Sequence, residues 1–156
     1  MAHPTNFAKL MEKFILNPAL NGSYAEAIWR GFQLVEVHDK LLHNDNQLLL
    51  RLKIQPNFCN YQGTIHGGAL CTILDCATTL AILKVDKHHR KNVSAELNYS
   101  FLSPATVNDN LLILSECYKV GKTMAFTKAD LYIEDGLKLI GTGRHLKAML
   151  AQKFDE

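Results

Sequence analysis

The stretch from residue 69 to residue 83 reads Ala69-Leu-Cys-Thr-Ile-Leu-Asp-Cys-Ala-Thr-Thr-Leu-Ala-Ile-Leu83. Its only charged residue is Asp75, and the other side chains are apolar or small on nearly every face, which is typical of a helix buried in a core. The stretch is shorter than the ~20 residues that cross a bilayer, and an acid at its centre would be costly there. We therefore expect a buried helix and no membrane span.

On both sides of this helix the hydrophobic pattern changes to a period of two, which indicates β-strands. Before it, strands around Val35 and over 48–54 flank a polar turn at 43–46 and predict a hairpin. After it, strands are expected at 92–101, 111–118, 123–133 and 137–150. The short connections between these strands imply antiparallel neighbours. The pattern predicts an α+β fold in which one antiparallel β-sheet wraps around the long buried central helix.

The first of the later strands, 92–101, has a clear alternation. Val93 and Leu97 are expected on one face, and Ser94 and Glu96 on the other. Taken alone, Ser94 would therefore face solvent.

The N-terminal residues predict short helices. Apolar residues spaced three and four apart favour an amphipathic helix over 6–16, and Ser23 with Glu26 is typical of a capping box that starts a helix through Ile28. A chain of 156 residues fits one domain at ~100–200 residues per domain. We expect a single domain over 1–156 with an N-terminal helical segment at 1–30.

The composition excludes several classes of function. A net charge of +2 is too small for nucleic-acid binding through bulk charge. The basic run 84–91 is typical of a solvated helix end, although it could also attract a phosphate. Four cysteines without a C-x-x-C pair argue against a metal site, and together with an N-terminus unlike a secretory signal they indicate a reduced compartment, cytoplasmic or mitochondrial.

Two features of the central helix can carry chemistry. His66-Gly67-Gly68 opens the helix, and glycines there either let a ligand approach the bare backbone N–H groups or only permit close packing of helix and sheet. Asp75 stands among apolar residues, where burial would raise its pKa towards that of a useful base, unless it is a structural acid held by local hydrogen bonds.

The distance between these two features constrains any shared site. Gly67 and Asp75 are eight positions apart, which is ~12 Å along a helix at 1.5 Å per residue. Both cannot reach one reacting carbon from the same chain. If both are catalytic, a two-fold dimer must bring Asp75 of one chain to Gly67 of the other, which predicts an obligate dimer.

Five motifs occur in a fixed order between about Asn60 and Lys147. They are Asn60-x6-Gly67-Gly68-x6-Asp75, Asn92-Val-Ser94-x3-Asn98-Tyr99, Leu102-Ser-Pro-Ala105, Gly121-Lys-Thr-Met-Ala-Phe126 and Gly141-Thr-Gly-Arg-His145. In this order they resemble the hotdog-fold acyl-CoA thioesterases. The resemblance implies a hotdog fold, a homodimer or dimer of dimers, and hydrolysis of fatty or aryl acyl-CoA to free acid and CoA.

The resemblance also implies roles for individual residues. The Gly67 N–H, helped by Asn60, would polarise the thioester carbonyl. Asp75 of the partner chain would act as nucleophile or general base, Ser94 would orient the attacking water, and His66 would lie beside the site. No metal or redox cofactor is implied, because CoA enters as part of the substrate.

The CoA arm is expected to contact residues further along the chain. These are Ser103, Pro104, Ala105, Thr106, Gly121, Lys122, Thr123, Arg144 and Lys147. Two other functions stay open: a non-catalytic acyl-CoA-binding module that uses the same pocket, and a hotdog acyl-thioester hydratase or dehydratase, which generally pairs a catalytic histidine with an acid in a different local motif.

Overall fold

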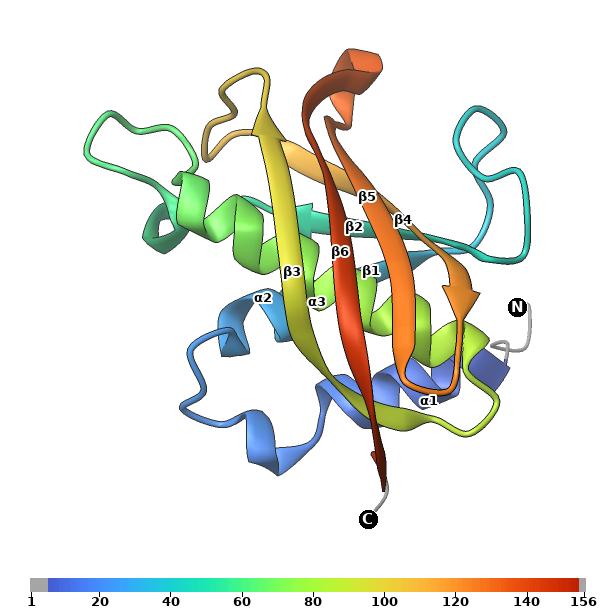
Figure 1. The fold of residues 1–156 in the computed structure, drawn as a ribbon. Coiled ribbons are helices and arrows are strands. Elements are labelled where there is room, and N and C mark those ends of the chain that lie inside the picture. Colours follow the sequence, from blue (N-terminus) through green and yellow to red (C-terminus); the bar gives the residue numbers. More distant parts are fainter. Residues whose placement is uncertain (1–5, 155–156) are drawn as a thin grey trace.

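The computed structural model describes residues 6–154, in which a six-stranded sheet curls around a long helix (Figure 1). The helices are α1 (Asn6–Ile15), α2 (Glu26–Gly31) and α3 (Gly67–Val85), with 3₁₀ turns η1 (Pro18–Leu20), η2 (Pro56–Phe58) and η3 (Asp135–Leu137). The strands are β1 (Gln33–Val35), β2 (Gln47–Lys53), β3 (Arg90–Phe101), β4 (Asn110–Val120), β5 (Met124–Ile133) and β6 (Lys138–Lys153). The predicted α+β arrangement is confirmed, while residues 1–5 and 155–156 of the expected domain lie outside the described residues.

The strand order is β1-β2-β4-β5-β6-β3, and every neighbouring pair is antiparallel. Tight turns join β4 to β5 and β5 to β6, as the sequence predicts. β3 follows α3 in the chain but pairs with the C-terminal strand β6. Within residues 6–154, the outer edge of β3 therefore has no strand partner.

The central helix α3 lies in the concave face of the sheet (Figure 1). It has 19 residues, four more than the stretch 69–83, and by length and hydropathy it could cross a membrane. The sequence argument that the helix is too short to do so was therefore wrong. Its packing assigns it to the core, because Leu74, Leu80 and Ile82 are all 0% exposed. We therefore describe α3 as the core helix of the sheet.

The N-terminal helices cover one end of this core. α1 matches the predicted helix. The Phe14 ring packs edge-on against the rings of Trp29 and Phe154, with a distance of 5.1 Å between ring centroids in each pair. The predicted capping box is wrong. α2 begins at Glu26, whose carboxylate instead accepts a hydrogen bond from the Gly22 N–H at 2.7 Å.

The alternation predicted for β3 is interrupted by a bulge. Ser94 pairs with Lys147 of β6, but the next paired residue is Glu96, which stands opposite Leu146. The extra residue changes which side chains face inward. As a result Ser94 lies on the side of β3 that faces α3, where its hydroxyl contacts Asp75, and it remains exposed to solvent in the single chain.

Candidate active site

Asp75 lies near the middle of α3 and faces strands β3 and β6. Its Oδ1 atom accepts hydrogen bonds from the Ser94 hydroxyl at 3.3 Å and from Lys147 Nζ at 2.5 Å. The side chain is 42% exposed, so the expectation of a fully buried acid is wrong for the single chain. The carboxylate is held by a cation on one side and is open on the other.

Lys147 is the cation that contacts the Asp75 carboxylate. The residue is 3% exposed, and its Nζ donates to Asp75 Oδ1 and to the Thr79 hydroxyl at 2.7 Å. A buried ammonium group is stable only when it is paired. The structure thus places Lys147 against the candidate catalytic acid and away from the surface on which a CoA contact was expected.

His145 is the second titratable group of β6 beside Asp75. Burial, reinforced by the neighbouring positive charge of Lys147 and opposed by Asp75, lowers the pKa of His145 to about 4. The imidazole is therefore neutral near pH 7, and its 3.7 Å approach to Asp75 Oδ1 is no ion pair at that pH. Its Nδ1 instead lies 2.9 Å from the Thr78 hydroxyl.

The N-terminus of α3 forms a separate group of polar atoms. His66 is the N-cap, and its Nδ1 accepts a hydrogen bond from the Gly68 N–H at 2.8 Å. The Gly67 N–H has no acceptor among residues 6–154, so it is available to a ligand oxygen. The ring of Phe101 lies over this residue, 3.1 Å from the position that a Gly67 Cβ would take.

The loop before α3 is shaped by Asn60. Its Oδ1 accepts from the Gln62 N–H at 2.9 Å, and its Nδ2 donates to the Thr64 hydroxyl at 3.0 Å. In the single chain the Asn60 amide therefore supports the loop that leads into α3. It does not point its Nδ2 group at an open site.

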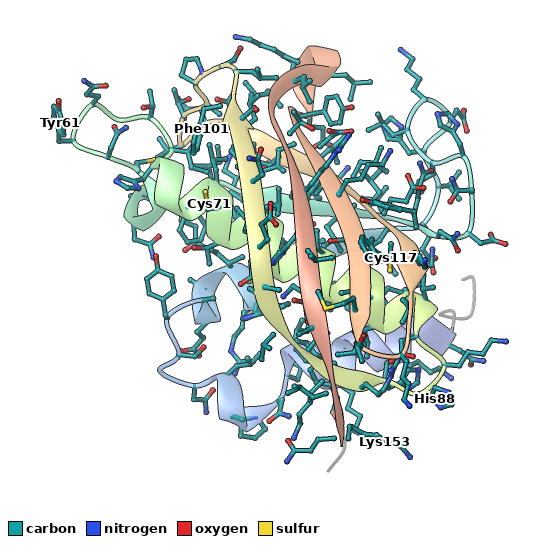
Figure 2. The ribbon with its side chains drawn as sticks, viewed as in Figure 1. Tyr61, Cys71, His88, Phe101, Cys117 and Lys153 are labelled. Carbon is teal, nitrogen blue, oxygen red and sulfur yellow. The ribbon has the colours of Figure 1, made fainter. Side chains whose placement is uncertain are left out.

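The two stretches expected to contact CoA lie at opposite ends of the central helix α3. The loop 103–106 adjoins the N-terminus of α3, because the Ile65 N–H donates to the Ala105 carbonyl at 2.8 Å. The turn 121–123 adjoins the other end of α3, where Arg90 donates to the Gly121 and Lys122 carbonyls at 3.1 and 2.9 Å. In Figure 2, Phe101 and His88 mark these two ends.

Arg90 also binds Asp86 through its guanidinium group, with an Nε to Oδ2 distance of 3.1 Å. Part of the basic run 84–91 is thus used within the fold, while Lys122 is exposed. Arg144 is exposed as well, and it lies on the sheet face opposite to the one that carries His145 and Lys147.

One chain therefore brings together Asp75, Ser94 and Lys147, and separately Asn60, His66 and Gly67 with the loop 103–106. Sequence reasoning gave no role to His145 or Thr79. Strand parity could have found His145, because positions 141, 143, 145 and 147 of β6 are all buried and face α3.

The described residues contain neither a candidate metal-binding cluster nor a disulfide bond. Within the described part of the chain, no group of three or more His, Cys, Asp or Glu side chains could hold a metal ion. Cys59, Cys71, Cys76 and Cys117 are all free, and burial raises the pKa of the Cys117 thiol to about 11.

Comparisons with known proteins agree with this architecture. The family model described as thioesterase superfamily matches residues 62–140. Human acyl-coenzyme A thioesterase 13 is 35% identical over 101 residues, which are 65% of this chain and 71% of the human protein, and the mouse protein is 34% identical over the same span.

Solved structures extend the likeness to nearly the whole chain. Mouse thioesterase superfamily member 2 superposes with a TM-score of 0.75 at 26% identity, and covers 93% of this chain and 98% of its own. Zebrafish thioesterase superfamily member 2 has a TM-score of 0.76 at 24% identity, with coverage of 94% and 100%. The hotdog fold expected from the sequence is thereby confirmed, and the chain belongs to the thioesterase superfamily.

Proposed function

We propose that this protein is an acyl-CoA thioesterase that hydrolyses acyl-CoA to a free acid and CoA. The observation that carries the proposal is the carboxylate of Asp75, fixed on the core helix by Lys147 and Ser94 and still open on one side. The relatives named acyl-coenzyme A thioesterase 13 supply the substrate class.

The proposed hydrolysis uses a hydrogen-bond donor, the Gly67 N–H, and a carboxylate, that of Asp75. The Gly67 N–H, at the positive end of the α3 dipole, polarises the thioester carbonyl and stabilises the oxyanion that forms. As a general base, Asp75 takes a proton from water while the water oxygen bonds to the carbonyl carbon. The C–S bond then breaks, and the CoA thiolate receives the proton. Attack by Asp75 itself, followed by hydrolysis of the anhydride, is the alternative route.

We further propose that the site forms between two chains. Gly67 and Asp75 are separated by more than two turns of α3, so a single chain cannot present both to one carbonyl. The free edge of β3 supports pairing with a second copy, because an unpaired edge strand is a template for another strand. Val93 and Phe101 of this strand and Leu102 just beyond it are at least half exposed, which supports the same surface.

The CoA arm fits this assembly. The loop 103–106 and the turn 121–123 adjoin opposite ends of the 19-residue helix α3, so in the dimer each chain would contribute one of them to a given CoA. Lys122 and Arg144 are the exposed cations available for its phosphates. A dimer of dimers would provide such contacts, and hydrolysis would need no metal or redox cofactor. Four free cysteines support a cytoplasmic or mitochondrial setting.

The experiment is thiol release from short-, medium- and long-chain acyl-CoAs and one aryl-CoA, followed with a thiol reagent. The wild type is compared with Asp75→Asn, which keeps the shape of the side chain, and with Asp135→Asn, a change at an exposed turn acid. We expect turnover to fall by about 10²-fold or more in Asp75→Asn alone. Unchanged turnover in that variant overturns the mechanism, and CoA binding without any thiol release points to a binding module.

A further inference from the structure

The contacts to Asp75 are confined to one oxygen of its carboxylate. Lys147 Nζ and the Ser94 hydroxyl both donate to Oδ1, and His145 approaches the same atom. No residue within 6–154 donates to Oδ2. The side chain is 42% exposed, and Oδ2 is the oxygen left without a donor from these residues.

Lys147 is itself held in place by the core helix. The Thr79 hydroxyl accepts a hydrogen bond from Lys147 Nζ at 2.7 Å and donates to the Asp75 backbone carbonyl at 2.9 Å. The ammonium group is thus fixed between two side chains that lie one turn apart on α3. A buried group with two partners has little freedom to swing towards a ligand phosphate.

The charges around the carboxylate come from one strand. β6 contributes Lys147 and His145, and the imidazole is neutral near pH 7. β3 contributes the uncharged Ser94, and on α3 the buried Cys76 thiol, whose pKa is raised by burial, stays protonated. Lys147 is therefore the cation that is paired with the Asp75 carboxylate.

We propose that Lys147 is the positioning residue of the active site. It anchors Asp75 through Oδ1 and leaves Oδ2 to act on water or on the thioester carbon. This role rests on the proposed function, because it matters only if Asp75 acts in hydrolysis. It differs from the CoA contact that the sequence led us to expect for Lys147.

The test measures kcat and KM for Lys147→Met, Lys147→Arg and Lys122→Met. Methionine keeps the length of the side chain and removes the charge, and the partly exposed Asp75 stays solvated, so the variant should fold; thermal unfolding checks this. We expect kcat of Lys147→Met to fall about 10–100-fold with KM changed less than about threefold.

The two other lysine variants give contrasting results. Lys147→Arg restores the charge and should recover part of kcat. Lys122→Met, at the exposed turn, should raise KM through weaker CoA binding. A rise in KM with kcat retained in Lys147→Met would instead make Lys147 a CoA ligand and overturn the proposal. A fall in kcat in Lys147→Met that Lys147→Arg does not recover at all would make Lys147 a merely structural residue and would also overturn the proposal.

The variant Thr79→Val tests the positioning role of Lys147 without removing the charge of Lys147. The change is close in shape and deletes only the hydroxyl that holds Lys147 Nζ. We expect a smaller loss of kcat, about 3–10-fold, in the same direction and with the fold retained. If Asp75→Asn is inactive while Lys147→Met and Thr79→Val behave like the wild type, the role of Lys147 is wrong and the proposed function survives; an active Asp75→Asn overturns both.

Discussion

The side chain of Tyr99 occupies the space that a Cβ on Gly141 would need. Its hydroxyl oxygen lies 1.9 Å, and its Cζ 2.3 Å, from that Cβ position. The ring packs edge-on against Phe101 with a centroid distance of 4.7 Å. Gly141 is therefore a steric requirement of the aromatic pair on β3, which explains one glycine of the Gly141-Thr-Gly143 motif without any role in binding.

Gly141→Ala should destabilise the protein by about 1–3 kcal/mol, because the added methyl group displaces the Tyr99 ring from the core. In a Tyr99→Val background, which removes the ring, the same change should cost much less. Urea unfolding of the four proteins gives the coupling free energy. An equal cost in both backgrounds would contradict the steric explanation.

Gly67→Pro should lower kcat by about 10²–10³-fold, because it removes the N–H proposed to stabilise the oxyanion. Gly67 is the first residue of α3, where proline is well tolerated, and His66 before it has φ −70° and ψ 139°, which suits a residue that precedes proline. Gly67→Ala is the matched control, since it keeps the N–H and requires only a small shift of Phe101. Equal activity of the two variants would argue against an oxyanion role for this N–H.

A shared site predicts that two inactive variants rescue each other. In a heterodimer of Asp75→Asn and Gly67→Pro chains, one site carries both changes and the other carries none. The purified heterodimer should therefore have about half of the wild-type turnover, since one of its two sites is intact. Co-expression with two affinity tags and purification of the mixed species measures this. An inactive heterodimer would place each site within one chain.

His145 should make the stability of the protein depend on pH. Its pKa is lowered to about 4 from the ordinary 6.5, so between these values the unfolded chain binds a proton that the folded chain does not. Stability is thus lost as the pH falls from about 6.5 to about 4, by up to about 3 kcal/mol at ~1.4 kcal/mol per pKa unit. The buried Nε2 atom has no hydrogen-bond partner in residues 6–154, which agrees with an imidazole that is not protonated there.

Urea unfolding of the wild type and His145→Gln at pH 7 and pH 5 isolates this contribution, because other titrating groups affect both proteins alike. The free energy of unfolding of the wild type should fall more than that of the variant. Parallel pH dependence in the two proteins would show that His145 titrates normally in the fold.

The sequence predicted the helices and strands well because the hydrophobic period of each one is set by residues that are close together in the chain. The strands from β2 to β6 lie close to their predicted positions, and the hydrophobic run at 69–83 became α3 with two residues added at each end. The capping box at Ser23 failed because Glu26 bonds to Gly22 and Arg30 instead. A short polar motif offers several local partners, and the packing selects among them.

The candidate site was predicted less completely than the fold. Asp75 and the His66-Gly67-Gly68 turn were chosen from their positions on an apolar helix, but Ser94 was chosen only through resemblance. The bulge between Ser94 and Glu96 reverses the strand face, and no period in the sequence reveals where a strand will bulge.

By itself the sequence determined an apolar helix with one acid, a glycine pair at the start of that helix, and strands with short antiparallel connections. Only the tertiary structure showed that Lys147 meets Asp75, 72 positions earlier in the chain. The reason is physical. Hydrophobic periodicity is set by neighbouring residues, whereas the pairing of two charges depends on the register of β6 against α3, which the packing of the whole core fixes.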